Sequence, residues 1–366
     1  MNTKRRATRA RLAAIGVAAA SAVLVAGCGA ANEGGDSGGS GGASGTISGA
    51  GATSQQAAMQ AWKAAFEGAN NGATVNYDAV GSGGGRTQFV DGGVAFAGSD
   101  SAIKDDQLAK AKTRCGGQLI EIPDYVSPIA VAYNLPGVQQ LNLAPATVAG
   151  IFKGQITTWN DPKIAADNPG AQLPATRINP VHRADDSGTT NNFTDYLNKA
   201  AGSVWTDKAA DKWPVAGGEA AQGTSGVRDA ISKGAGSIGY IDASQAAQLG
   251  KANLKVGNTY VGPTADAAAK IFEESQKKEG GDPGQFAYTL NRTANNAYPA
   301  VLVSYLLACG QYPDAAQADT TKAFLKYVTS QEGQQAAAQS AGAAPIPDSL
   351  RQQITPVIDG IKAANG

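Results

Sequence analysis

The chain has 366 residues, of which 42% are hydrophobic and 16% are charged, so it is long enough for about two globular domains with a buried core. It contains 30 basic and 30 acidic residues, and this balance argues against a nucleic-acid-binding protein, which needs a clustered excess of Lys and Arg. Because there is one histidine and the three cysteines are widely spaced, we expect no metal site and no cofactor.

Residues 1–27 have the pattern of an export signal. Five basic residues and no acid lie within residues 1–11, and a short apolar run follows from Leu12 to Ala26. This run is shorter than the roughly 20 residues that a membrane-spanning helix needs. Residues 24–28 read Leu-Val-Ala-Gly-Cys, which resembles the lipobox of bacterial lipoproteins. We therefore expect cleavage before Cys28 and attachment of lipid such as palmitate to it; the alternative is a small residue beside an ordinary cleavage site.

Residues 28–45 are predicted to form a flexible linker. Eight of the 17 residues from Gly29 to Gly45 are glycine, so the stretch cannot bury a core. It includes Gly-Asp-Ser-Gly-Gly at residues 35–39, the string around the nucleophile of trypsin-like proteases. We interpret this string as a coincidence, because a serine nucleophile needs a rigid oxyanion hole and an oriented base.

Loss of the export signal changes the charge and the redox environment of the chain. Residues 1–27 hold five of the 30 basic residues and no acid, which leaves 25 basic against 30 acidic residues, a net charge of −5. A bound anion would then have to be held by local dipoles and specific residues. In an oxidising compartment, the two remaining cysteines, Cys115 and Cys309, are predicted to form a disulfide. The alternative is two separate buried thiols.

Short apolar runs alternate with helical patterns from residue 47 onward, which predicts an α/β fold with largely parallel sheets. Helices are predicted at Thr53–Phe66, at Gly81–Val90 after a glycine turn, and near Thr320–Ser340. Strands are predicted at Ala73–Ala79, Val94–Ala97, Leu119–Ile122, Ile129–Tyr133, Ile178–Val181 and Ser237–Ile241. Gly257–Pro263 is a candidate crossing segment, and Ala300–Cys309 is a further apolar run.

Four segments share one chemical character: residues 49–54 (GAGATS), 81–86 (GSGGGR), 97–100 (AGSD) and 183–190 (RADDSGTT). Three of them place small hydroxyl residues and glycine just before a predicted helix, where unpaired N–H groups and the positive end of the helix dipole attract anions. Singly, each is explained as a helix cap or a turn. Together they predict a site for a tetrahedral oxyanion. The dinucleotide pattern GxGxxG is excluded because Arg86 occupies its last position.

These segments resemble the substrate-binding lipoproteins of bacterial phosphate-specific ABC transporters, the PstS type of periplasmic binding protein. The motifs that carry the resemblance are GAGATS (49–54), VNYDAVGSGGGRTQF (75–89), FAGSDSAI (96–103), IFKGQITTWNDP (151–162), HRADDSGTT (182–190) and PIPDSL (345–350). The resemblance implies a two-lobed periplasmic-binding-protein fold with hinge-connecting strands and a ligand cleft between the lobes. The predicted lobes are residues 46–128 with 258–366, and residues 129–257, with hinges near Ser127–Ala130 and Gly257–Pro263.

The same resemblance implies a function and a set of partners. The expected function is high-affinity binding of inorganic phosphate outside the cytoplasmic membrane, with hinge closure around the anion and delivery to the permease and ATPase subunits of an ABC transporter. We expect a non-enzymatic monomer, anchored by lipid on Cys28 to the outer face of the membrane. Two alternatives remain: an exported phosphatase with Ser82 or Ser187 as nucleophile, and a sensory or adhesive surface lipoprotein that keeps the fold.

Carried over residue by residue, the resemblance assigns the phosphate ligands. They are the Thr53 hydroxyl, the Ser54 backbone N–H, Ser82, the acceptor Asp100, and the donors Arg183, Ser187, Gly188 and Thr189. Ser54 replaces a bulky apolar residue of the best-known pattern, which alters the lining of the cleft but not a backbone contact.

The expected roles of Arg183 and Asp100 follow from the chemistry of their side chains. Arg183 can offer a charge-assisted fork to two phosphate oxygens, with Asp185 orienting it from behind; the alternative is a surface salt bridge to Asp185 or Asp186. Asp100 can accept a hydrogen bond from the proton that phosphate retains near neutral pH and that sulfate lacks, so sulfate would face a like charge without a donor. The alternative for Asp100 is a helix cap or a surface acid. His182 is expected to be structural.

Overall fold

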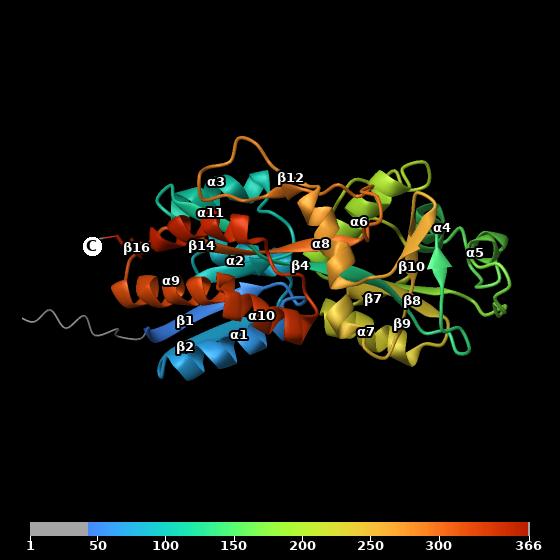
Figure 1. Ribbon diagram of the computed structural model, residues 1–366, viewed down its shortest axis with the longest axis horizontal. Coiled ribbons are helices and arrows are strands. Elements are labelled where there is room, and N and C mark those ends of the chain that lie inside the picture. The colour runs from blue at the N-terminus through green and yellow to red at the C-terminus, as the bar shows by residue number, and fades with distance from the viewer. Residues whose placement is uncertain (1–42, 365–366) are drawn as a thin grey trace, which may run out of the picture. The chain divides into compact units, whose positions relative to one another are not determined.

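The computed structural model describes residues 43–364 (Figure 1). The predicted signal peptide, the lipid-acceptor Cys28 and nearly all of the predicted linker lie outside the described residues. Among residues 43–364, no helix combines the length and apolarity needed to span a membrane.

One nine-stranded sheet runs through the described chain. Eight of its strands have the order β2-β1-β3-β14-β4-β8-β6-β7, and β9 pairs with β4. The strands are β1 (Ser44–Gly51), β2 (Gly72–Asp78), β3 (Phe96–Ser99), β4 (Leu119–Tyr133), β6 (Asn179–Arg183), β7 (Glu219–Ala221), β8 (Ser237–Asp242), β9 (Gly250–Lys251) and β14 (Val301–Cys309). Smaller sheets contain β5 (Asn142–Leu143) with β10 (Asn253–Val256) and β11 (Thr259–Val261), β12 (Gln276–Lys277) with β13 (Tyr288–Thr289), and β15 (Gln311–Tyr312) with β16 (Lys362–Ala363).

Strand β4 connects two halves of this sheet. All 15 of its residues are buried, and it pairs with β14 as far as Pro128 and with β8 from Ile129 onward. We call the half built on β1, β2, β3, β14 and the start of β4 the first lobe, and the half built on the end of β4, β6, β7 and β8 the second lobe. A bulge in the β4–β14 ladder leaves Asp124 between the paired residues Pro123 and Tyr125.

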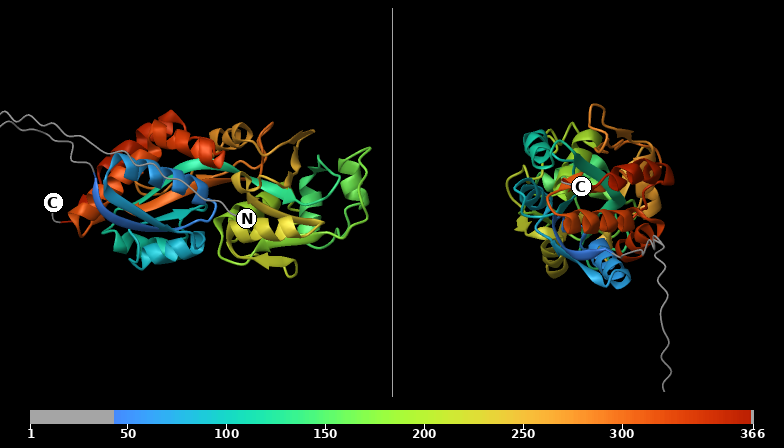
Figure 2. Two further views of the ribbon diagram at one scale, coloured as in Figure 1. Left: turned by 90° about the horizontal axis from the view of Figure 1, so that it is seen from below. Right: turned by 90° about the vertical axis from the view of Figure 1, so that its left-hand side faces the viewer.

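Helices cover both sides of the strands (Figure 2). In the first lobe, α2 and α9 pack against β1, and α1 packs against β2 and α10. In the second lobe, α7 packs against β6 and β8, and α6 packs against β8. The helices are α1 (Gln56–Ala69), α2 (Ser82–Val90), α3 (Asp105–Arg114), α4 (Pro145–Phe152), α5 (Pro162–Asp167), α6 (Gly188–Ala200), α7 (Gly223–Lys233), α8 (Ala265–Glu273), α9 (Ala315–Thr329), α10 (Gln331–Ala341) and α11 (Asp348–Asp359), with a 3₁₀ turn η1 at Ala243–Gln245.

Several sequence predictions need correction. The sheet is parallel at β1–β2, β1–β3, β6–β7 and β6–β8, but β4 and β14 run antiparallel to each other and to their other neighbours. Apolar runs that are buried on both faces carry no signal of direction, so this could not be predicted. The two runs predicted at Leu119–Ile122 and Ile129–Tyr133 form the single strand β4. The helix predicted near Thr320–Ser340 is two helices that meet at Ser330, whose hydroxyl accepts from Gly333 N and caps α10.

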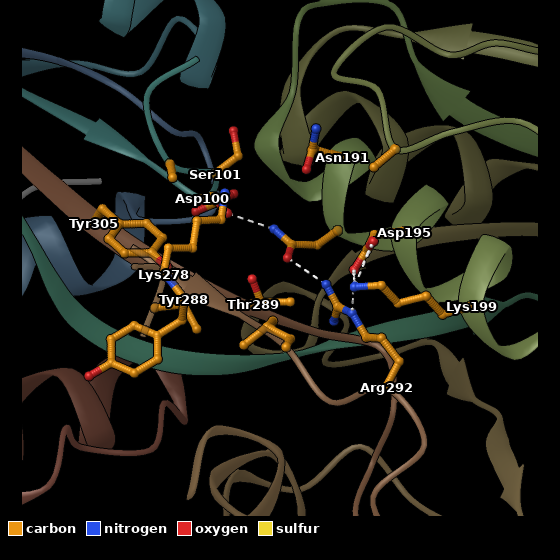
Figure 3. A pocket seen from close by; sticks show the side chains of 15 residues that line it. Asp100, Ser101, Asn191, Asp195, Lys199, Lys278, Tyr288, Thr289, Arg292 and Tyr305 are labelled. Carbon is orange, nitrogen blue, oxygen red and sulfur yellow. Dashed lines mark hydrogen bonds and ion pairs between the residues drawn. The ribbon is translucent and has the colours of Figure 1, made fainter. Parts of the chain in front are cut away.

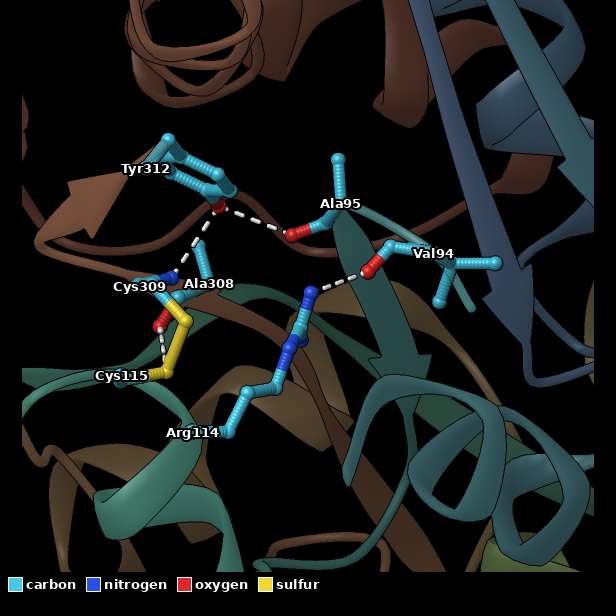
Figure 4. The surroundings of a disulfide bond; sticks show 7 residues. All are labelled: Val94, Ala95, Arg114, Cys115, Ala308, Cys309 and Tyr312. Atoms are coloured by element: carbon cyan, nitrogen blue, oxygen red, sulfur yellow. Dashed lines mark hydrogen bonds between the residues drawn. A yellow bond between two sulfur atoms is a disulfide. The ribbon is translucent and has the colours of Figure 1, made fainter. Parts of the chain in front are cut away.

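The predicted disulfide between Cys115 and Cys309 is confirmed, and two free thiols are therefore excluded (Figure 4). It joins the end of α3 to the last residue of β14, across 194 residues of sequence. Beside it, the Tyr312 hydroxyl donates to Ala95 O at 2.8 Å and accepts from Cys309 N at 3.1 Å. Arg114 Nη2 donates to Val94 O at 2.6 Å. The bridge thus ties α3, β14 and the segment before β3 into one unit.

Candidate functional site

The first lobe supplies its predicted site residues from the ends of neighbouring strands. Thr53 and Ser54 follow β1, Ser82 is the first residue of α2 after β2, and Asp100 follows β3. Because β1 is parallel to both β2 and β3, the carboxyl ends of these strands meet at one edge of the sheet, where ligands of α/β proteins commonly bind. Sheet topology therefore gathers four residues that are spread over almost 50 positions of sequence.

The second lobe contributes a strand end and a helix start. Arg183 is the last residue of β6, Ser187 is the N-cap of α6, and Gly188 and Thr189 are the first two residues of that helix. The Ser187 hydroxyl accepts from Thr190 N at 3.2 Å. The first N–H groups of a helix have no partner within it. The Gly188 and Thr189 N–H groups lie at the start of α6, the kind of place where helix N–H groups bind anions.

Asp100 lies where the two lobes meet, so it is neither a helix cap nor a surface acid. Ser54 Oγ donates to its two carboxylate oxygens at 2.7 and 2.6 Å, and Thr189 Oγ1 of the second lobe donates to Oδ2 at 2.9 Å. Asp100 N donates to Ser82 Oγ at 3.1 Å. A Cβ atom on Gly188 would lie only 2.7 Å from Ser82 Oγ, so glycine is what permits this close approach of the lobes. Ser54 and Thr189, one from each lobe, thus contact the Asp100 carboxylate, and Ser82 contacts its backbone.

Burial shifts the ionisation of Asp100. Burial raises the pKa of its carboxyl above the ordinary value, against the opposing effects of hydrogen bonds from Ser54 and Thr189 and the charge of Arg183. Ser304 Oγ is a further, longer donor at 3.4 Å. A buried acceptor such as the Asp100 carboxylate discriminates strongly between ligands that carry a proton and ligands that do not.

Arg183 and Asp185 form a buried pair. Arg183 Nε donates to Asp185 Oδ1 at 2.8 Å, Nη2 donates to Oδ2, and Gly223 N donates to Oδ1 at 3.0 Å. The two side chains are 2% and 8% exposed, so a surface salt bridge does not describe them. Burial alone would raise the pKa of Asp185, but the bonds and charge of Arg183 outweigh it, and the pKa is lowered. Asp185 thus holds the guanidinium in one orientation. Asp186 instead lies 3.9 Å from the exposed Lys212.

A third helix start lies at the same place, and it was not among the predicted segments. Thr224 Oγ1 of α7 lies 2.9 Å from Thr53 Oγ1, and Thr224 N donates to that same oxygen at 3.1 Å. Gly223, the first residue of α7, has φ of +66°, a conformation that favours glycine. Gln245 Nε2 donates to Thr53 O at 3.1 Å. Residues 222–226 read Gln-Gly-Thr-Ser-Gly, the same composition as the other segments, so the signal was present in the sequence.

A polar cavity of about 260 Å³ adjoins Asp100 (Figure 3). Asn192 Nδ2 donates to Asp100 O at 2.6 Å, and Arg292 Nη2 donates to Asn192 Oδ1 at 2.7 Å. Arg292 Nε in turn donates to Asp195 Oδ2 at 2.9 Å, and Asp195 also pairs with Lys199. This chain of polar contacts links α6 to the backbone of Asp100.

Behind the site, β4 and β8 bury further carboxyl groups. Burial raises the pKa of Glu121 to about 7 and that of Asp242 to about 6, and it raises the pKa of Asp124 well above the ordinary value. Asp124, placed by the β4 bulge, accepts from Gln55 Nε2 at 3.0 Å. These raised pKa values reflect the poorly solvated interior behind the site, which disfavours the charged form of each carboxyl group.

The chemistry of the gathered residues suits anion binding. Ser82 Oγ and Ser187 Oγ each accept from a backbone N–H, from Asp100 and Thr190 respectively. His182 stacks on Trp213 with ring centroids 5.2 Å apart, and its Nδ1 lies 3.0 Å from Arg183 O, as expected for a structural residue. Within residues 43–364, no three His, Cys, Asp or Glu side chains are grouped as metal ligands.

Comparison with known proteins gives consistent similarities. A family model described as a PBP superfamily domain matches residues 36–332. Phosphate-binding protein PstS 3 of Mycobacterium tuberculosis is 37% identical over 299 residues, which cover 79% of this chain and 80% of the relative. The protein of the same name from Mycobacterium leprae is 35% identical over 296 residues, with the same shares of 79% and 80%.

Two solved structures share the fold. A high affinity periplasmic phosphate-binding protein (PfluDING) bound with phosphate aligns with a TM-score of 0.69 at 24% identity, over 87% of this chain and 99% of its own. A phosphate-binding protein from Stenotrophomonas maltophilia aligns with a TM-score of 0.69 at 18% identity, over 86% of this chain and 94% of its own. At these identities the structures establish the fold alone, and they confirm the predicted two-lobed periplasmic-binding-protein architecture.

Proposed function

Because the chain belongs to the PstS family of phosphate-binding proteins within the PBP superfamily, we propose that it binds one inorganic phosphate between its two lobes and delivers it to a phosphate ABC transporter. One observation carries this proposal: the N-termini of α2, α6 and α7, the Arg183 guanidinium and the buried Asp100 carboxylate converge between the lobes. Helix N-termini bind phosphate through free N–H groups and the helix dipole, even in a chain whose predicted mature charge is negative.

In the proposed complex, the donors divide between the lobes. Thr53 offers a hydroxyl and Ser54 a backbone N–H, with Ser82 at the start of α2. From the second lobe, Arg183 would donate through the guanidinium N–H groups that do not bind Asp185. Ser187, Gly188 and Thr189 would donate from the start of α6. The Arg183 guanidinium is held by Asp185, so little of its rotational freedom would be lost on binding.

Asp100 is the proposed selectivity residue. The hydroxyl groups of Ser54 and Thr189 now donate to it, and both can rotate to donate to phosphate oxygens instead. The Asp100 carboxylate would then accept a hydrogen bond from the P–OH group that phosphate retains near neutral pH. Sulfate has no proton to give and would bring a second negative charge against a buried carboxylate, which is strongly unfavourable.

Closure around the anion is proposed to occur about β4. Its pairing changes from β14 to β8 between Pro128 and Ile129, which supports a hinge in that segment. We propose lobes formed by residues 46–128 with 258–366 and by residues 129–257, and the change of pairing supports the boundary between residues 128 and 129. Hinge closure of this kind buries the ligand and presents a distinct surface to a permease.

We further propose a non-enzymatic lipoprotein. The export pattern and lipobox support lipid on Cys28 and a position at the outer face of the cytoplasmic membrane, from which a monomer would serve the permease and ATPase subunits. The hydroxyls of Ser82 and Ser187 accept backbone hydrogen bonds, which does not favour a role as nucleophile. Release of phosphate from an aryl phosphate ester would contradict this proposal.

Calorimetric titration tests the central claim. Phosphate and then sulfate would be titrated at neutral pH into the mature chain, beginning at residue 28 and stripped of bound anions. We expect saturable binding of one phosphate with no competition from sulfate. Absence of saturable phosphate binding would refute the proposed function, and equal binding of sulfate would refute the role of Asp100.

A further inference from the structure

Arg86 is a buried cation outside the proposed ligand set. It lies in α2 and is 2% exposed. Three neutral acceptors of its own lobe hold its guanidinium: Nε donates to Gln107 Oε1 at 3.0 Å, and Nη1 donates to Ser99 Oγ at 2.8 Å and to Ser101 Oγ at 3.0 Å. The guanidinium is thus fixed in position by the first lobe alone.

Its fourth partner comes from the other lobe. Arg86 Nη2 donates to Asp211 Oδ2, and Lys104 Nζ lies 2.8 Å from the same oxygen. The Asp211 carboxylate is 5% exposed, whereas the Lys104 side chain is 40% exposed. The Arg86–Asp211 ion pair is therefore buried, and Lys104 adds a positive charge at the solvent-exposed edge of this pair.

Asp211 belongs structurally to the second lobe. Its carbonyl oxygen accepts from Ser187 N at 3.0 Å, directly at the cap of α6. Two residues later, Trp213 stacks on Tyr240 of β8 with ring centroids 5.6 Å apart. The same residue thus faces Arg86 with its carboxylate and supports the start of α6 with its backbone.

We propose that Arg86 and Asp211 form a clamp between the lobes, which holds the cleft closed and sets the rate of ligand release. The inference rests on the proposed function, since the ligand released is the phosphate bound between the lobes. When the lobes open, the Asp211 carboxylate moves with the second lobe and becomes solvated. Arg86 keeps its three first-lobe acceptors and therefore the same orientation. Formation of the pair also seats the Asp211 carbonyl on Ser187 N, which couples closure to the geometry of the α6 cap.

This arrangement predicts a specific kinetic signature. The clamp forms only after the lobes come together, so its loss acts on dissociation and leaves the encounter of phosphate with the open cleft unchanged. An interaction that merely stabilised the fold would change the unfolding midpoint without changing the dissociation rate.

The kinetic test uses Asp211→Asn, which keeps the size of the side chain and removes its charge. Stopped-flow measurement on the full mature chain, with inorganic phosphate as the probe, is expected to show dissociation about tenfold faster, equivalent to about 1.4 kcal/mol, with association within about twofold. Lys326→Gln, which removes one side of the exposed Lys326–Asp359 pair, is the matched control and is expected to change neither rate. Equal dissociation rates for Asp211→Asn and wild type would overturn the clamp.

A double-mutant cycle provides a second test of the Arg86–Asp211 interaction, in case one variant fails to fold. Arg86→Lys keeps the charge but cannot satisfy the same set of acceptors, and it is combined with Asp211→Asn. We expect the effects on dissociation to be strongly non-additive, because the two side chains act on one interaction. Full additivity would contradict direct coupling across the lobes.

A distance measurement separates failure of the clamp from failure of the proposed function. Spin labels would be attached to cysteines placed at the exposed Lys110 of α3 and Lys163 of α5, with Cys28 replaced by serine. Without phosphate, Asp211→Asn is expected to shift the distance distribution toward longer, open separations. An unchanged distribution refutes the clamp. If wild-type protein shows no saturable phosphate binding, the proposed function is refuted, and the distance shift still decides whether the clamp exists.

Discussion

Replacement of Asp100 by asparagine tests the proposed selectivity mechanism with little structural disturbance. The side chain keeps its shape, and the hydroxyl groups of Ser54 and Thr189 that now donate to it can rotate to accept from the new amide. The Asp100 backbone contacts with Ser82 and Asn192 are unaffected by the change. We therefore expect a folded protein whose cleft differs by one charge.

The magnitude follows from the contacts around the carboxylate. Loss of one charge-assisted hydrogen bond from the phosphate proton costs roughly 1.5–3 kcal/mol, which corresponds to a 10- to 150-fold weaker affinity. For sulfate the change has the opposite sign, because the variant removes a buried like charge and supplies an amide donor. The ratio of phosphate to sulfate affinity is thus expected to fall by more than the phosphate affinity itself.

Competition calorimetry measures both quantities. Sulfate would be titrated into wild-type protein and into Asp100→Asn, each stripped of anions, followed by phosphate into the sulfate-loaded samples at neutral pH. Ser54→Ala is a useful companion, because it removes a donor to Asp100 and keeps the charge. If Asp100→Asn still rejects sulfate while it binds phosphate, the charge of Asp100 does not determine selectivity and the reasoning is wrong.

Three further predictions concern closure, covalent stabilisation and pH. Gly188→Ala would place a methyl group 2.7 Å from Ser82 Oγ, so calorimetry should show phosphate affinity at least about tenfold weaker with the unfolding midpoint nearly unchanged; unchanged affinity would show that the lobes need not approach this closely. Replacement of Cys115 and Cys309 by serine opens a loop of 194 residues and should lower the free energy of unfolding in urea by roughly 2–5 kcal/mol. Equal stability of the wild-type protein with and without a reductant would contradict this prediction. Burial raises the pKa of Glu121 from 4.5 to about 7, so the folded state holds this proton more tightly than the unfolded state. Its contribution to stability is therefore full below pH 4.5 and falls by about 3 kcal/mol as the pH rises to about 7. Glu121→Gln should flatten that part of the pH profile of urea unfolding, and an identical profile would refute the assignment.

Helix-start chemistry is local, and for that reason much of the site could be predicted from the sequence. Small hydroxyl residues and glycine before a helix have the same meaning in any fold, so Thr53, Ser82 and Ser187 could be singled out without coordinates. The structure brings them together with Asp100 and Arg183 between the lobes. The disulfide was also predictable, because an export signal and two remaining cysteines leave few choices.

Strand direction and pairings between distant residues were decided only by the tertiary structure. Nothing in the apolar run of β14 indicates that it lies between β3 and β4 and runs antiparallel to both. Thr53 meets Thr224 across 171 residues of sequence, and Arg86 meets Asp211 across 125. Burial on both faces removes the alternation that reveals a strand's register and neighbours. The sequence by itself therefore determined which groups can bind an anion, and the order of strands in the sheet decided which of them face one another.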